Sequence, residues 1–252
     1  MTIWPLLKRG LLVGLLAGLV AGVFAFIFGE PRVQDAIDIE EAASAQASLT
    51  PVLGDISDWV VSRPEQRAGL FLGTMLYGAG VGAMFTLAFA LVRGRGTARD
   101  DWQLSTRLAF GLFAALVLVP FLKYPANPPA VGDPETIGER TWLYLAMLAT
   151  GLLSLVAAAR VMWSVRDDAP VWLRPVAGIG TFVVLSGFVA LVLPDINEVP
   201  AEFPAPLLWE FRLSSLGTQA VLWTTLGVGY GIASMRAAAT EAESPAVAQA
   251  SV

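Results

Sequence analysis

Acidic side chains stand at the ends of long apolar segments, where they could collect cations. Glu30 lies in a Gly-Glu-Pro sequence after the first such segment. Asp195 follows Pro194 after the fifth segment, with Glu198 three residues further on. Carboxylates around a mouth of low dielectric constant concentrate cations and speed their encounter. Solvated loops are also commonly charged, so the pattern by itself leaves both explanations open.

Two missing residue types limit the chemistry further. The chain has no cysteine and no histidine, which excludes disulfides, thiol nucleophiles and histidine as a general base or metal ligand. HExxH and Walker A motifs are also missing, and no apolar segment has an ionisable residue at its centre. We therefore expect neither an enzyme nor a proton relay through a buried carboxylate. A net charge of −5 gives no basic footprint for nucleic acid.

Long charge-free segments must position these acids. Of the 252 residues, 56% are hydrophobic and 15% are charged, against about 45–50% and about 25% in soluble domains. A helix needs about 20 apolar residues to cross a bilayer. The sequence therefore predicts an all-α polytopic integral membrane protein with about six transmembrane helices. The predicted spans cover residues 10–29, 68–92, 104–122, 141–160, 175–194 and 213–235, and polar residues are most frequent in the sixth.

The basic residues predict the orientation of these spans. Cytoplasmic loops are enriched in Lys and Arg, and a cytoplasmic N-terminus places ten of the 16 basic residues inside. The linker 93–107, with four arginines, contributes most to this assignment. An even number of spans places the C-terminus in the cytoplasm as well. The outer side then holds 15 of the 21 acidic residues, which form an acidic outer rim.

Three segments need separate interpretation. The first apolar run, followed by Ala43-Ser44-Ala45, resembles a signal peptide, but the run is too long and the cleavage pattern too distant, so we expect a retained helix. The outer loop 30–67 should hold a short amphipathic helix at 33–41, either a cap over the outer mouth or an inert interfacial helix. Residues 237–252 should form a disordered C-terminal tail.

Glycines recur along two of the predicted helices. In the first span they are spaced four residues apart, from Gly10 through Gly14 to Gly18 and Gly22. Small residues at this spacing let helix backbones approach closely, so tight packing is the simpler interpretation. The alternative hypothesis is that a glycine face lines a narrow pathway, where the exposed backbone carbonyls would touch the substrate. Its candidate residues are Gly18, Gly22, Gly78 and Gly82.

The outward ends of the first, third and fifth spans resemble one another. Each is expected to end in a turn of proline and polar residues, and Ala-Leu-Val-Leu leads to both Pro120 and Pro194. This similarity weakly indicates parallel two-helix repeats, an arrangement known in transporters. Proline is also common at the ends of membrane spans in general, which would explain the similarity without repeats.

Several sequence blocks resemble the CbtA family, described as the probable cobalt transporter subunit. The blocks run from the first span to the last, and the one at 120–132 is the most specific. They are Arg-Gly-Leu-Leu at 9–12, Phe-Gly-Glu-Pro at 28–31, Ala-Ile-x-x-Glu-Glu at 36–41, Pro-Phe-Leu-Lys-Tyr-Pro-Ala-Asn-Pro-Pro-Ala-Val-Gly at 120–132, Thr-Ile-Gly-Glu-Arg-Thr at 136–141, Leu-Pro-Asp-Ile at 193–196, Phe-Pro-Ala at 203–205 and Leu-Trp-Glu-Phe-Arg at 208–212.

The resemblance implies a multi-pass subunit of the bacterial inner membrane that imports cobalt for cobalamin synthesis. It also implies a one-span partner with a histidine-rich tail, CbtB, and five spans rather than six. No cofactor is expected to stay bound, and cobalt(II) would be the cargo. Imidazole suits Co²⁺ well, and this chain has none. Either the partner's histidines capture the metal, or oxygen ligands of this chain hold it.

Weak oxygen ligation would suit an ion in transit. The candidate ligands at the outer turns are Glu30, Asp195, Glu198 and Glu210, with Tyr124, Asn127, Asp133 and Glu139 of the third-to-fourth loop as contributors. Ordinary turn chemistry is the competing explanation for Asn127 and Asp133. A membrane scaffold or assembly partner of another transport complex fits the same residues. Metal selectivity, energy source and oligomeric state are not determined by these patterns.

Overall fold

The computed structural model describes residues 3–47, 63–95, 98, 100–129, 131–132 and 134–250, and these residues form helices and no strands. Five helical stretches are long and apolar enough to cross a membrane, which confirms the all-α polytopic class. They run Ile3–Ala42, Glu65–Val92, Asp101–Lys123, Ile137–Ser164 and Leu173–Val192. Four of them match the second to fifth predicted spans to within a few residues.

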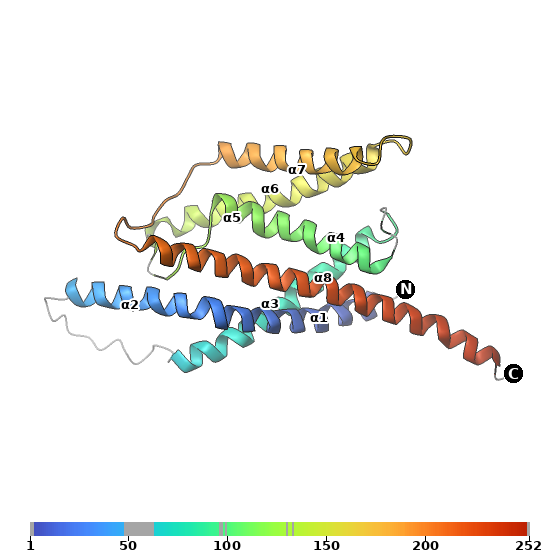
Figure 1. Ribbon diagram of the computed structural model, residues 1–252, viewed down its shortest axis with the longest axis horizontal. Coiled ribbons are helices and arrows are strands. Elements are labelled where there is room, and N and C mark those ends of the chain that lie inside the picture. Colours follow the sequence, from blue (N-terminus) through green and yellow to red (C-terminus); the bar gives the residue numbers. More distant parts are fainter. Residues whose placement is uncertain are drawn as a thin grey trace.

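The helices form a row with one central member. Helix α7 (Leu173–Val192) packs on α6 (Ile137–Ser164) at one side, and α1 (Ile3–Phe24) packs on α3 (Arg63–Val92) at the other. Helix α8 (Ala205–Ala250) lies between them, against both α1 and α4 (Asp101–Phe113), as Figure 1 shows. Successive helices run in opposite directions, so the predicted outer turns gather at one end of the bundle.

The first helix does not end at Pro31, so the predicted turn of proline and polar residues there is wrong. Helix α1 passes through a π-helical segment, η1 (Ala25–Gly29), into α2 (Glu30–Ala47) without interruption. The Glu30 N–H donates to the carbonyl of Ala25, five residues back. A π-turn accommodates the proline that follows, because proline has no N–H and its ring crowds the carbonyl of the preceding turn. The short outer helix predicted at 33–41 is therefore part of α2.

The third span also contains a π-helical segment before a proline. Helix α4 continues through a second π-helical segment, η3 (Ala114–Leu118), into α5 (Val119–Lys123). The Val119 N–H donates to the Ala114 carbonyl, and Pro120 follows directly and is buried. The third span still ends close to its predicted end, at Lys123 before Tyr124 and Pro125, and the fifth ends as expected, with α7 stopping at Val192 just before Pro194. The two π-turns carry their helices past proline, so the similarity of the three outer exits is weaker than the sequence suggested.

The glycine faces of α1 and α3 pack against each other. A Cβ atom at Gly78 would lie 2.7 Å from the Gly18 Cα, and one at Gly82 would lie 2.9 Å from the Gly14 Cα. A Cβ at Gly22 would overlap the Thr74 hydroxyl. The contacts at Gly18, Gly22, Gly78 and Gly82 therefore support the simpler interpretation, in which these glycines let the two helices pack closely.

Helix α8 is central and contains the sixth predicted span. Its Leu226 and Tyr230 are fully buried, and the Tyr230 ring meets Phe85 and Phe89 edge-on at centroid distances of 5.4 and 5.0 Å. The Ser105 hydroxyl of α4 donates to the Gly227 carbonyl of α8 at 2.7 Å. Helix α8 is not among the five stretches that are apolar enough to span a membrane, so its membrane crossing stays a prediction.

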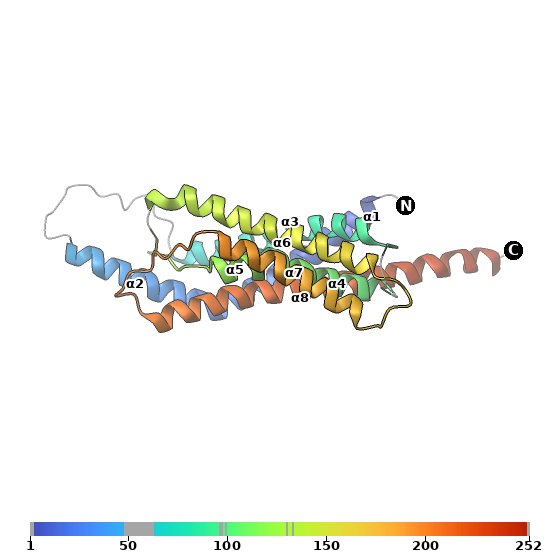
Figure 2. The ribbon, with the colours of Figure 1, turned by 90° about the horizontal axis from the view of Figure 1, so that it is seen from above.

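The C-terminal part of the chain differs from the prediction of a disordered tail. Helix α8 continues to Ala250 and extends beyond the other helices, which Figure 2 shows from above. The residues after Arg236 are rich in Ala and Glu, both strong helix formers, so the helix that begins in the bundle can propagate outward. The last two residues, 251 and 252, lie outside the described part.

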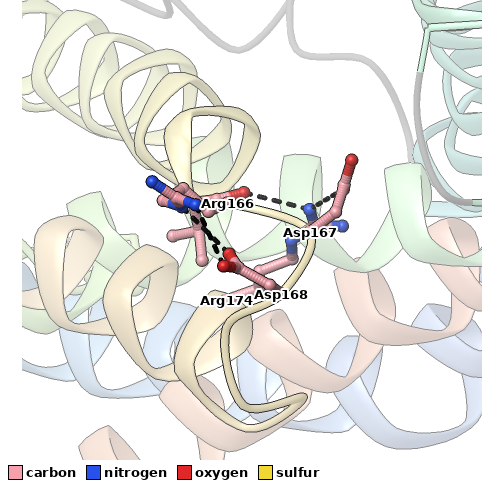
Figure 3. Close-up of polar contacts among 5 residues, drawn as sticks. Arg166, Asp167, Asp168 and Arg174 are labelled. Atoms are coloured by element: carbon pink, nitrogen blue, oxygen red, sulfur yellow. Dashed lines mark hydrogen bonds and ion pairs between the residues drawn. The ribbon is translucent and has the colours of Figure 1, made fainter.

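The α6–α7 turn lies at the end of the bundle opposite the predicted outer turns. Arg166 pairs with Asp168 through two 3.0 Å contacts, and Arg174 pairs with Asp167 while donating to the Val165 carbonyl at 3.0 Å (Figure 3). These pairs are close in the chain and fix the turn locally. The Arg166 guanidinium holds the pKa of the Asp168 carboxyl below its ordinary value.

Candidate functional site

Two cavities open at the predicted outer end of the bundle, on either side of α8. The first, of ≈ 460 Å³, lies between the start of α8, the end of α5, the start of α6 and the α7–α8 loop. The polar residues that line it are Tyr124, Asn127, Arg140, Tyr144, Asn197, Glu198, Arg212, Ser215 and Gln219. We call it the arginine cavity, because Arg140 and Arg212 both line it.

The second cavity, of ≈ 410 Å³, lies between α8, the η1–α2 junction and α3. Its charged lining is Glu30 and Arg67, and we call it the Glu30 cavity. Phe211, Ser214 and Thr218 line it from α8. The two cavities share Ser215 and Gln219. Helix α8 therefore presents one polar surface to both.

Helical periodicity explains this arrangement on α8. Residues 212, 215, 216 and 219 are spaced i, i+3, i+4 and i+7, so they lie on one face and line the arginine cavity. Residues 211, 214, 215, 218 and 219 form the adjacent face toward the Glu30 cavity. The hydroxyls of Ser214 and Thr218 donate to carbonyls of α8 itself, at 2.8 Å each. The buried Oε1 atom of Gln219 has no hydrogen-bond partner.

Each of the four predicted metal ligands is paired with a basic side chain. The Glu30 carboxylate accepts from Arg67 at 2.8 and 3.3 Å, and only 13% of its side chain is exposed. The Glu198 carboxylate lies 3.0 Å from Arg140 Nη1 and also accepts from the Thr136 hydroxyl. These two pairs line the Glu30 cavity and the arginine cavity respectively.

The other two predicted ligands lie nearer the surface. Glu210 Oε2 lies 2.7 Å from Arg32 Nε, and this pair joins α8 to α2. Asp195 contacts Lys123 Nζ, yet 92% of its side chain is exposed. Among the described residues no group of three or more acidic side chains could hold a metal ion. The four carboxylates thus lie apart from one another, and each faces an arginine or lysine of another segment.

Gly132 makes one of these pairs possible. Its φ of +128° suits glycine, and a Cβ atom there would overlap Arg140 Nη1 and lie 3.1 Å from Glu198 Oε2. The backbone thus passes directly over the Arg140–Glu198 pair. Of the segment just before Gly132, Pro125, Ala126, Asn127 and Val131 line the arginine cavity.

The four loop candidates have different surroundings. The Tyr124 hydroxyl donates to the Pro194 carbonyl at 2.8 Å, and burial raises the pKa of its phenol, opposed by Lys123 and assisted by Asp195 and Glu139. Asn127 Oδ1 accepts from Arg212 Nη2 at 2.9 Å. Glu139 is exposed, and Asp133 lies outside the described residues. Tyr124 and Asn127 therefore line the arginine cavity, with hydrogen bonds that also brace it.

Basic and amide residues of this site were not singled out from the sequence. Arg67, Arg140 and Arg212 were counted only as outer basic residues, although each lines a cavity. Gln219 and its neighbouring Ser and Thr residues were noted only because they made the sixth span polar. That polarity was the available signal, since polar side chains within a membrane helix face the bundle interior or a cavity.

The comparison with protein families decides the family. A model described as the probable cobalt transporter subunit, CbtA, matches residues 4–234. The chain belongs to the CbtA family. Both cavities and the central part of α8 lie inside the matched region. Searches of curated proteins and of solved structures found no match.

Proposed function

We propose that this chain is the membrane subunit of a cobalt uptake system that supplies cobalamin synthesis. The observation that carries the proposal is the family match over residues 4–234. The five apolar helices and the two cavities at one end of the bundle are consistent with a transport role. We place the N- and C-termini in the cytoplasm of a bacterial inner membrane, so that both cavities open outward.

The Glu30 cavity is the favoured entrance for the cation. Its Glu30 carboxylate is nearly enclosed, and the ion must displace Arg67 to reach it. The exposed carboxylates of Asp195 and Glu210 would raise the local cation concentration at the rim without binding tightly. Glu198 would offer a second enclosed carboxylate after separation from Arg140.

A bare cation held only by oxygen ligands binds weakly, which permits release. A histidine-rich one-span partner of the CbtB type would supply the nitrogen ligands that this chain lacks. Capture by the partner and transit through the oxygen-lined cavity of this subunit would then be successive steps.

The test is uptake of radioactive cobalt by cells that lack other importers. Cells would express the chain with and without the one-span partner. Glu30→Gln should lower the initial uptake rate by about tenfold or more, as expected for loss of a metal-binding group. Glu202→Gln, which changes an exposed acid that lines neither cavity, serves as the matched control and should retain most of the rate. Glu30→Gln together with Asp195→Asn should abolish cobalt-dependent growth at unchanged membrane levels, and normal uptake in that double variant would contradict the site.

A scaffold role is the alternative, and one observation favours it. All four candidate carboxylates are already paired with Arg or Lys, as expected of groups that hold helix ends together. A scaffold would co-purify with its partner while cobalt flux stayed the same in its presence and absence. Uptake measured together with co-purification therefore separates the two functions.

A further inference from the structure

The arginine cavity has a charge that the cation proposal does not explain. Among the described residues, its lining contains two guanidinium groups, Arg140 and Arg212, and one carboxylate, Glu198. Because Glu198 pairs with Arg140 at 3.0 Å, the charge of Arg212 remains. No carboxylate among the described residues forms an ion pair with Arg212, whose recorded partners are the Ala126 carbonyl and the Asn127 amide oxygen.

Arg212 has unused donors. A guanidinium group carries five N–H groups. The Nε–H donates to Ala126 at 3.2 Å, and one Nη2–H donates to Asn127 at 2.9 Å. Three N–H groups therefore remain, on the two terminal nitrogens, and these form the fork that binds carboxylate or phosphate in a bidentate manner. The contacts to Ala126 and Asn127 hold the half-buried guanidinium in place before any ligand arrives.

A second polar group in the same cavity also lacks a partner. The buried Oε1 of Gln219 accepts no hydrogen bond, which is costly for a desolvated amide. Gln219 follows Arg212 by two helical turns on one face, about 10 Å along the α8 axis. Ser215 lies between them, and the apolar wall opposite includes Val117 and Phe121.

We propose that the arginine cavity binds an organic oxyanion. Its carboxylate or phosphate group occupies the fork of Arg212, and the rest of the molecule extends along α8 past Ser215 toward Gln219. The volume of ≈ 460 Å³ admits a small hydroxycarboxylate or the headgroup of an anionic lipid. The two sources share this chemistry, and the experiment distinguishes them. The proposal does not rest on cobalt transport.

The test uses purified full-length protein with two sets of probes. Citrate and inorganic phosphate are titrated calorimetrically at low ionic strength. Thermal stability is compared in nanodiscs of phosphatidylglycerol and of phosphatidylcholine. Binding of citrate assigns the site to a soluble anion, and stabilisation by phosphatidylglycerol alone assigns it to a headgroup. In either case Arg212→Gln should weaken the effect by about 10- to 100-fold, as expected for loss of a charge-assisted bidentate pair. Arg32→Gln, which removes an outer arginine paired with Glu210, is the matched control and should leave binding unchanged.

A third variant tests the sign of the preferred charge without removing Arg212. Gln219→Glu is nearly isosteric and adds a negative charge to the lining. It should weaken oxyanion binding by at least about tenfold, in the range of direct charge effects in enclosed sites. The proposal is overturned if Gln219→Glu leaves oxyanion binding unchanged, or if no probe binds the wild-type protein. It is also overturned if Arg212→Gln and Arg32→Gln weaken binding equally, which would indicate a diffuse surface charge effect.

Discussion

Helices α7 and α8 are neighbours in the chain, yet the more apolar of the two, α7, is the more exposed, and the more polar one, α8, is buried. Helix α7 is among the five strongly apolar stretches, and its buried residues are only Gly178 and Ser186. Helix α8 is more polar and buries Trp223, Leu226 and Tyr230 at the centre of the bundle. Lipid is as apolar as leucine, so apolar side chains gain little by leaving it, whereas polar ones do gain. Hydropathy therefore indicates which helix faces lipid, and polarity indicates which helix lies inside.

Truncation of a large side chain should show the largest difference between the two helices. Leu226→Ala on α8 removes a fully buried side chain and should cost about 2–5 kcal/mol, because a cavity remains. Leu191→Ala on α7, where the side chain is 88% exposed, should change stability little. Thermal unfolding in detergent measures both, and equal losses would contradict the central position of α8.

Enlargement of a glycine should have the next largest effect. A Cβ at Gly227 on α8 would lie 2.5 Å from the Ala109 Cβ, whereas one at Gly180 on α7 meets nothing within 4 Å. Gly227→Leu should therefore destabilise the bundle by about 1–3 kcal/mol or more. Gly180→Leu is the control for the change in residue type. A well-folded Gly227→Leu protein with unchanged Tm would show that α8 and α4 are not in contact.

Removal of one hydroxyl should give a smaller effect. Ser105→Ala breaks the hydrogen bond to the Gly227 carbonyl on α8 and should cost about 0.6–2 kcal/mol. Ser186→Ala on α7 removes a hydroxyl that donates to Phe182 of its own helix at 2.7 Å, and should cost less. The difference between the two Tm changes reports the bond between helices. A larger decrease in Tm for Ser186→Ala than for Ser105→Ala would contradict this prediction.

The exposed turn before α7 should give the smallest effect. Because Arg166 lowers the folded-state pKa of Asp168, any stabilisation is present above the ordinary pKa of 3.8 and is lost as pH falls through the lower folded value. The pair is exposed, and such pairs contribute little. Asp168→Asn should leave Tm at pH 7 unchanged within error. A clear decrease at pH 7 that disappears at pH 3 would show that this turn matters more than its exposure indicates.

Much of the helical plan was predictable, because it depends on local composition. The second predicted span, 68–92, ends at the same residue as α3, and the fifth, 175–194, overlaps α7 almost completely. The end of the first helix was not predictable from Pro31 alone. A π-turn that accommodates proline depends on backbone geometry over several residues, and residue preferences do not specify it.

The candidate site was predicted only in part. Glu30, Glu198, Tyr124 and Asn127 do line cavities at one end of the bundle. Their partners Arg67, Arg140 and Arg212 come from other segments, and no spacing rule connects residues so far apart in the chain. The pairing of these acids with basic residues of other segments was therefore not predictable from the sequence.

The sequence by itself determined the membrane class and the approximate positions of the second to fifth apolar spans. A bilayer sets the length of every span, and hydropathy is a sum over neighbouring residues. Only the tertiary structure decided that α8 is central, that each outer carboxylate has a basic partner, and that Arg212 lacks one among the described residues. These features depend on which helix ends meet. Close packing between segments that are far apart in the chain determines those contacts.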